Sequence, residues 1–253
     1  MVHFVGAGPG AKDLITVRGA ALLGQAGCVI YAGSLVNREL LDYANNSCKF
    51  YDSAKMTLEE VIDIMLENER DGLMTVRLHT GDPSLYGAIK EQIDILISNN
   101  IAYEVTPGVS SFAASAAALG AEYTLPGVSQ TVILTRMEGR TPVPERESIA
   151  KLAETRASMA IFLSSGMLAE LSAKLIEGGY PGTTPAAIVY KVTWPDEKIM
   201  RTTVELLSSA GAVSGISKTA LILVGDFLGG EYERSLLYNP EFSHGYRAGT
   251  GSI

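Results

Sequence analysis

The stretch FVGAGPGAKDLIT, residues 4–16, is the segment on which the fold prediction rests. It begins as an apolar run, turns through three glycines and a proline, and leads into a segment with helical periodicity at about 16–25. A strand, a tight turn and a helix in this order are typical of the first unit of a parallel α/β sheet. Such sheets bind ligands at the carboxyl ends of their strands, so the question is which ligand this turn approaches.

The same alternation of short apolar runs and longer amphipathic segments continues along the chain. In the first half it predicts strands at 2–5, 28–31, 74–78 and 103–105. It predicts helices there at about 16–25, 35–43, 57–69 and 87–98. In the second half it predicts strands at 131–135, 159–163, 187–190 and 221–224. The helices predicted there lie at about 148–153, 168–177 and 203–210. Between the halves, residues 118–130 combine turn-forming residues with weak periodicity. We therefore expect two α/β domains, residues 1–124 and 125–253.

Composition excludes several classes of function. The chain has 253 residues, of which 47% are hydrophobic and 19% charged, and its formal net charge is −8. Without a run of Lys and Arg, it is not expected to bind nucleic acid. No apolar stretch approaches the ~18 residues of a membrane-spanning helix, and the N-terminal residues lack the pattern of an export signal. Cys28 and Cys48 form neither a disulfide framework nor a metal-ligand spacing, which favours a cytoplasmic protein with no metal site.

Residues 6–11, GAGPGA, formally match the dinucleotide-binding pattern G-x-G-x-x-[GA]. The second predicted strand, however, ends in Tyr31 followed by Ala32 and Gly33, where that fold needs an acidic residue for the ribose. Pro9 also removes one backbone N–H from the loop. A nicotinamide-binding oxidoreductase therefore stays as the alternative enzyme class. A tight turn without a ligand, or an interaction protein without activity, are the remaining alternatives.

Two further small-residue turns follow predicted strands. HTGDPSLYG, residues 79–87, follows the strand at 74–78, and TPGVSS, residues 106–111, follows the strand at 103–105. Because the carboxyl ends of parallel strands meet at one edge of a sheet, the three turns are expected to lie together and to favour a binding crevice there.

The segments that contain these turns resemble the motifs of the tetrapyrrole methylase family, which methylates macrocycle carbons with S-adenosylmethionine. They are VGAGPGAKDLITVRG (5–19), GDPSLYG (81–87) and TPGVSSFAASAAALG (106–120). Two more segments, 29–37 and 125–148, are similar to the subgroup that methylates carbon 11 of precorrin-4 or cobalt-precorrin-4 in corrin biosynthesis. Sister enzymes that act on another macrocycle carbon, such as those for uroporphyrinogen III or precorrin-2, are the alternative within the family. The resemblance implies two α/β domains that form a cofactor cleft, S-adenosylhomocysteine as product, and a homodimer.

The resemblance also implies site residues. The expected cofactor contacts are Pro9, Thr80, Gly81, Asp82, Leu85, Ser110, Ser111, Leu163 and Ala187. The glycine loop, with Gly8 and Gly10, is expected to face the substrate. Physical chemistry supports this, since a helix N-terminus repels a sulfonium cation but suits the carboxylates of a macrocycle. For Asp82 the residues leave a second interpretation open, a cap for a helix that begins after Pro83.

An anionic tetrapyrrole needs local positive charge on this acidic chain. Arg136 and Arg140 bracket the turn RMEGR, and Arg77 lies at the end of a predicted strand, so these three are the candidate substrate contacts. The alternative is a solvated loop that Glu138, Glu145 and Glu147 neutralise.

Methyl transfer from a sulfonium depends mainly on alignment in a dry cleft, because charge is neutralised during the reaction. A base is needed only if a proton leaves the macrocycle afterwards. Asp82, Tyr86 and His79 are the candidates for that role, and an ordinary hydrogen-bonded histidine is the alternative for His79.

Overall fold

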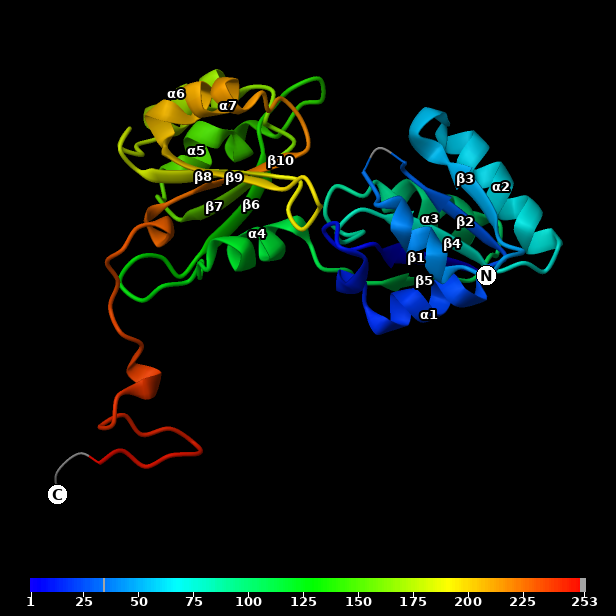
Figure 1. Cartoon of the computed structure of the whole chain (residues 1–253), viewed down its shortest axis with the longest axis horizontal. Helices are drawn as coiled ribbons and strands as arrows, with labels where there is room; N and C mark the ends of the chain where they lie inside the picture. Colours follow the sequence, from blue (N-terminus) through cyan, green and yellow to red (C-terminus); the bar gives the residue numbers. More distant parts are fainter. Residues whose placement is uncertain (34, 251–253) are drawn as a thin grey trace. The chain divides into compact units, whose positions relative to one another are not determined.

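The computed structural model describes residues 1–33 and 35–250; residue 34, inside the quoted segment 29–37, and residues 251–253 lie outside the described part. The chain forms two compact units (Figure 1). The first contains Met1–Ser115 together with Lys191–Glu197, and the second contains Ala116–Tyr190 and the chain from Lys198 onward. This division falls inside helix α4 (Ser111–Leu119), whereas the sequence predicts a division after residue 124.

The first unit is a parallel sheet of five strands with helices on both faces. The strands are β1 (Val2–Gly6), β2 (Cys28–Tyr31), β3 (Lys49–Asp52), β4 (Thr75–His79) and β5 (Tyr103–Thr106), in the order β3-β2-β4-β1-β5. The helices are α1 (Val17–Gln25), α2 (Leu58–Arg70) and α3 (Ile89–Ser98), and the segment 35–43, predicted as a helix, forms only a short 3₁₀ helix at Arg38–Tyr43. Strand β3, with its largely exposed residues, escaped the sequence prediction.

Alternation along the strands gives each face of this sheet its own core. Val5 and Leu78 pack with Leu23 of α1 on one face. On the other face, Phe4 packs with Met65 of α2 and with Leu96 of α3. Helix α2 lies where a helix is predicted at about 57–69, and it begins with a capping box between Thr57 and Glu60.

The second unit contains a mixed sheet, which corrects the expectation of parallel strands throughout. Its strands are β6 (Val132–Arg136), β7 (Ser158–Phe162), β8 (Pro185–Tyr190), β9 (Lys198–Thr203) and β10 (Ala220–Val224), in the order β6-β7-β10-β8-β9. Only the β6–β7 pair is parallel among these described strands, because β8 and β9 form a hairpin and β10 inserts antiparallel between β7 and β8. Helices α5 (Ile149–Ala153), α6 (Leu168–Glu177) and α7 (Leu207–Ser214) pack on one face of the sheet (Figure 1).

The hairpin loop between β8 and β9, Lys191–Glu197, leaves the second unit and belongs to the first. Within the described residues, no helix combines the length and the apolar character needed to cross a lipid bilayer.

Candidate active site

Three glycine turns meet at one edge of the first sheet, as the sequence predicts from its parallel strands. They leave β1, β4 and β5, and the backbones of the first two bond directly: Ala7 N–H donates to the His79 carbonyl at 2.7 Å, and Gly81 N–H donates to the Gly8 carbonyl at 2.8 Å. A Cβ on Gly108 would lie 2.1 Å from the carbonyl oxygen of Gly81. Glycine is therefore required where the three turns cross.

Asp82 ties two of these turns together. One carboxylate oxygen accepts the Gly108 N–H at 2.9 Å, and the other accepts the Ser84 N–H at 2.8 Å and the Ser84 hydroxyl. Partial burial raises the pKa of Asp82, but these hydrogen bonds from Ser84 and Gly108 outweigh it and lower the pKa overall. Asp82 is therefore an ionised acceptor and a poor base. It caps no helix, because residues 83–86 form a turn and α3 begins only at Ile89.

His79 and Arg77 both lie inside the unit, which argues against the roles predicted for them. His79 is buried, and burial together with the charge of Arg77 lowers its pKa to about 3, so it is a very weak base. Its Nε2 has no hydrogen-bond partner in the part of the chain that the structure describes, so it is not an ordinary hydrogen-bonded histidine either. The Arg77 guanidinium is buried as well and bonds the Ile30 carbonyl at 3.3 Å and the Gln92 side chain at 3.4 Å. Arg77 is thus a structural cation beneath the sheet edge.

The loop after β4 remains accessible beyond Asp82. Thr80 is exposed, Leu85 is half-buried, and Tyr86 is 46% exposed. Tyr86 and Ala88 both adopt positive φ angles, 57° and 49°, which side chains with a Cβ rarely occupy. Strained backbone of this kind is concentrated at functional sites.

The turn after β5 lies against the same loop. A Cβ on Gly81 would lie 3.6 Å from the Cα of Ser110. Ser110 is buried and Ser111 is half-buried at the start of α4. Seven of the predicted cofactor contacts therefore gather in one cluster of loops in the first unit: Pro9, Thr80, Gly81, Asp82, Leu85, Ser110 and Ser111.

Two backbone N–H groups of the first glycine turn are already occupied, which argues against a phosphate cradle. Gly8 N–H donates to the Gly81 carbonyl at 3.2 Å, and Ala11 N–H donates to the Thr193 hydroxyl at 2.9 Å. A 3₁₀ turn at Lys12–Leu14 also separates the loop from α1, so no α-helix N-terminus faces it. Gly8 and Gly10 are both buried, and the Gly8 N–H already has a partner, so their contact with the substrate stays a prediction.

The two predicted cofactor contacts in the second unit differ sharply. Leu163 follows β7, is 67% exposed and has a positive φ of 53°, which makes it an accessible apolar side chain at a strand end. Ala187 is fully buried in β8 and paired with Leu223 and Arg201 on either side, so its side chain cannot contact a ligand. Because a backbone contact needs no exposed side chain, Ala187 stays a predicted cofactor contact.

The two predicted substrate arginines also differ. The Arg136 guanidinium donates to the carbonyls of Thr141 at 3.1 Å and Pro142 at 2.7 Å, so it holds its own loop in shape. Arg140 is exposed and makes no hydrogen bond or ion pair with any described residue. None of the three glutamates pairs with either arginine within that part of the chain, which leaves the Arg140 charge free.

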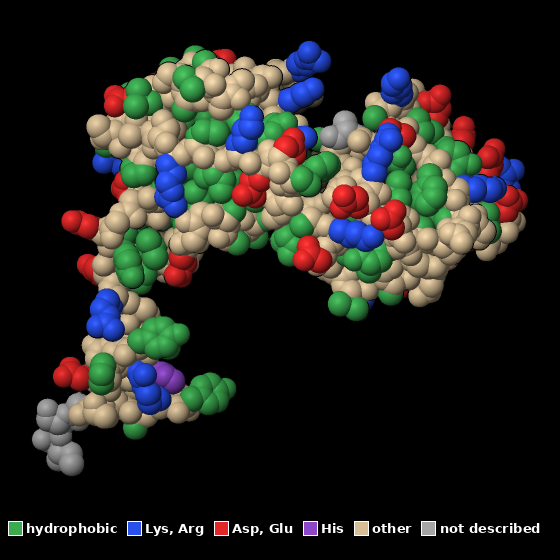
Figure 2. All heavy atoms as spheres, in the orientation of Figure 1, with side chains coloured by type: hydrophobic (Ala, Val, Ile, Leu, Met, Phe, Trp, Pro, Cys, Tyr) green, Lys and Arg blue, Asp and Glu red, His purple; other side chains and the backbone are tan. Residues whose placement is uncertain are grey.

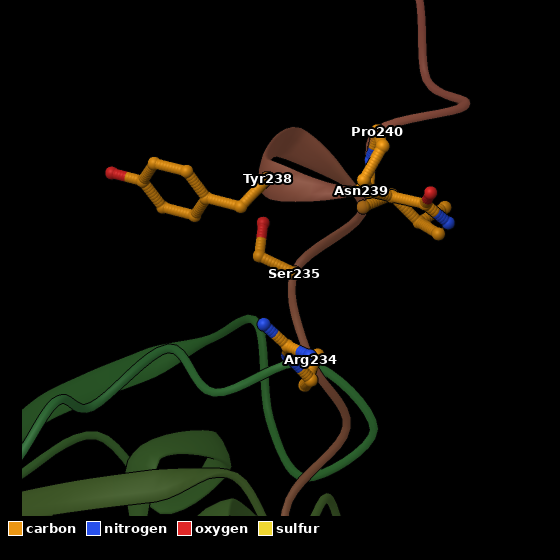
Figure 3. Close-up of a pocket in the computed structure, with 6 residues that line it drawn as sticks. Arg234, Ser235, Tyr238, Asn239 and Pro240 are labelled. Carbon is orange, nitrogen blue, oxygen red and sulfur yellow. The ribbon is translucent and has the colours of Figure 1, made fainter. Parts of the chain in front are cut away.

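Two further surface features can be compared with the predicted site residues. Basic side chains are interspersed with acidic ones on the face drawn in Figure 2. A cavity on the C-terminal segment is lined by Arg234, Ser235, Leu236, Tyr238, Asn239 and Pro240 (Figure 3) and contains none of the predicted cofactor contacts. Among the described residues, no group of three His, Cys, Asp or Glu is arranged to hold a metal ion.

The chain matches the model of the tetrapyrrole (corrin/porphyrin) methylases over residues 1–207. It belongs to the tetrapyrrole methylase family. It is 51% identical to the cobalt-precorrin-4 C(11)-methyltransferase of Methanocaldococcus jannaschii, over 97% of this chain and 95% of that protein. It is 44% identical to the precorrin-4 C(11)-methyltransferase of Pseudomonas aeruginosa, over 98% and 99% of the two chains.

The fold agrees with a solved structure of this family. The crystal structure of a cobalamin biosynthetic enzyme, cobalt precorrin-4 methyltransferase, superposes with a TM-score of 0.89 at 48% identity, and the match covers 90% of this chain and 96% of that one. The family resemblance and the α/β fold predicted from the sequence are therefore confirmed.

Three residues that hold the glycine loop of this tetrapyrrole methylase are not among the predicted site residues. They are Asn37, Thr193 and Trp194, whose side chains bond the backbone of residues 9–11. A tryptophan beside a proline in VTWPDEK, residues 192–198, is the one signal that marks this segment, and it does not reveal the contact.

Proposed function

We propose that this chain transfers a methyl group from S-adenosylmethionine to carbon 11 of cobalt-precorrin-4 or precorrin-4. The observation that carries the proposal is the 51% identity, along nearly the whole length of both chains, to an enzyme named for that reaction. The joined loops after β1, β4 and β5 support it, because the motif residues of the family lie in them.

The loop cluster of the first unit fits S-adenosylmethionine by its chemistry. It offers the hydroxyls of Thr80 and Ser111 and the ionised carboxylate of Asp82, and its loops present backbone rather than cationic side chains. A negative charge suits a cationic sulfonium, whereas a phosphate would be repelled. When bound, the cofactor supplies the methyl group as an electrophile. We infer that Pro9, residues 80–82, Leu85, Ser110 and Ser111 hold it, and Leu163, exposed at the end of β7, stays a predicted apolar contact.

The protein contributes mainly alignment and exclusion of water. Of the three candidate bases, His79 has its pKa lowered to about 3 and Asp82 holds its proton even less readily than a free carboxyl. Tyr86 is exposed on the strained loop after β4, so we assign to its phenol any proton that is held or moved beside the macrocycle.

For the anionic substrate, we infer that Arg140 meets a carboxylate and that Arg136 holds the loop that carries Arg140. The resemblance also supports a homodimer, and the free thiols of Cys28 and Cys48 support a reducing cytoplasm. Light scattering on the purified protein and fractionation of the source cells would test these two points.

The test of the function is a methyl-position assay. The purified chain is incubated with methyl-labelled S-adenosylmethionine and with either precorrin-4 or cobalt-precorrin-4, and the product is read by NMR. A new methyl on carbon 11 supports the proposal, and the faster substrate decides between the two forms. A methyl on another carbon would instead assign a sister activity. In parallel, calorimetry with S-adenosylhomocysteine and with NAD tests the cofactor class.

A further inference from the structure

The hairpin loop Lys191–Glu197 is held in its conformation by contacts among its own residues. The Lys191 ammonium bonds the Asp196 carboxylate at 2.7 Å and lies 5.2 Å from the centre of the Trp194 ring. The Thr193 N–H donates to the Glu197 carboxylate at 2.6 Å. Lys191 and Thr193 adopt positive φ angles of 44° and 67°, a costly conformation, above all for a β-branched residue. Such strain persists only where the surrounding contacts impose it.

This loop grips the glycine turn after β1. The indole Nε1–H of Trp194 donates to the Pro9 carbonyl at 3.1 Å, and the Thr193 hydroxyl accepts the Ala11 N–H at 2.9 Å. The ring also lies directly on Gly10, since a Cβ there would be 2.1 Å from the Trp194 Cδ1. Together with Asn37, which donates to the Gly10 carbonyl at 2.9 Å, side chains hold three successive residues of the turn.

The held residues connect directly to the rest of the loop cluster. Gly8, one residue before Pro9, exchanges two backbone hydrogen bonds with Gly81, at 3.2 and 2.8 Å. Gly81 in turn precedes Asp82, which bonds Gly108. A shift of Pro9 is therefore transmitted to the loops after β4 and β5, because these backbones touch without intervening side chains.

We propose that Trp194 and Thr193 are positioning residues for methyl transfer: they set the conformation of the glycine turn and, through it, the alignment of the loops that hold the cofactor. This inference rests on the proposed function for its effect on turnover, while its effect on cofactor binding does not depend on the macrocycle. The chemistry explains why the turn carries glycine at position 10, where the indole takes the place of a side chain.

The test compares Trp194→Phe, which keeps an aromatic ring but removes the indole N–H, with Thr193→Val and the conservative Thr193→Ser. Arg201→Met is the matched control, because it removes a side chain–carbonyl hydrogen bond of 2.8 Å to Leu119 in the second unit. For each variant, kcat, KM, the affinity for S-adenosylhomocysteine and the thermal unfolding midpoint are measured.

We expect Trp194→Phe and Thr193→Val to weaken S-adenosylhomocysteine binding by about fivefold, the worth of one hydrogen bond, and to lower kcat by roughly tenfold or more through misalignment. Thr193→Ser keeps the hydroxyl and should retain both values, and Arg201→Met should change stability only. Trp194 is the only tryptophan in the sequence, so its emission, followed in the wild-type protein, should change saturably as S-adenosylhomocysteine is added.

The proposal is overturned if Trp194→Phe and Thr193→Val bind and turn over like the wild type. It is also overturned if Arg201→Met, at the same loss of stability, loses as much binding and turnover as these two variants. If the wild type binds S-adenosylhomocysteine but methylates no precorrin, the proposed function fails, and the binding and emission measurements still decide the role of Trp194.

Discussion

The carboxylate of Asp82 accepts the backbone N–H of Gly108 over 2.9 Å, and this hydrogen bond joins the loop after β4 to the loop after β5. The predicted change is Asp82→Ala, which removes the acceptor for Gly108 and for Ser84. We expect the free energy of unfolding to fall by about 1 kcal/mol and S-adenosylhomocysteine binding to weaken at least fivefold. Urea denaturation and calorimetry measure the two effects.

The pKa of Asp82 gives this contact a pH dependence. Because the pKa is lower in the folded than in the unfolded protein, the stabilisation is complete above the unfolded pKa of about 4 and is lost as the pH falls through the folded value. Asp82→Asn should therefore flatten the stability profile below about pH 4. A variant that loses stability equally at all pH values would contradict this.

A further prediction concerns Gly108, because its lack of a side chain lets the backbones of the three glycine turns cross. Gly108→Ala would place a Cβ 2.1 Å from the Gly81 carbonyl and 2.7 Å from the Gly6 Cα. We expect a loss of about 3 kcal/mol in unfolding free energy together with loss of cofactor binding. The matched control is Gly24→Ala in α1, where the nearest atom is 3.5 Å away. It should be neutral or stabilising by up to about 1 kcal/mol. Equal effects at the two positions would refute the crossing argument.

His79 gives the stability a second pH dependence, because burial, and not hydrogen bonding, lowers its pKa. Burial lowers its pKa to about 3, so the unfolded chain binds a proton between that value and the unfolded pKa near 6.5, while the folded chain does not. Stability should therefore rise with pH over this window, and His79→Gln should make the rise shallower. The pH–rate profile of the wild type should show no inflection that His79→Gln removes. If the wild-type profile has an inflection that is missing in His79→Gln, then His79 titrates in the active enzyme and is not a neutral buried residue.

The two arginines of the RMEGR turn should separate in their effects. Arg140→Ala should raise KM for the macrocycle about five- to tenfold with unchanged unfolding midpoint and cofactor affinity, because an exposed cation loses one carboxylate partner. Arg136→Ala should expose residues 137–143 to proteolysis, because it frees the carbonyls of Thr141 and Pro142. Arg146→Ala is the control, an exposed arginine that pairs with Glu147. Should all three variants raise KM alike, the effect would be one of net charge.

Sequence alone determined the features that local chemistry encodes. Glycines after each of three strands predicted turns at one sheet edge, since parallel strands end together, and periodicity at about 57–69 predicted the helix α2. The motif segments that contain the turns indicated the family that the full-length comparisons confirm. These signals are short-range, so a single chain without its structure reveals them.

Tertiary structure decided everything that depends on residues far apart in the chain. β9 is a strand because it pairs with β8, and its own residues alternate too weakly to predict it. Arg77 and Ala187 are predicted site residues that packing buries. Above all, Trp194 and Thr193 reach a glycine turn more than 180 residues earlier. Such contacts arise when the whole chain packs, because their partners are chosen by proximity in space, and no local pattern of residues carries that information.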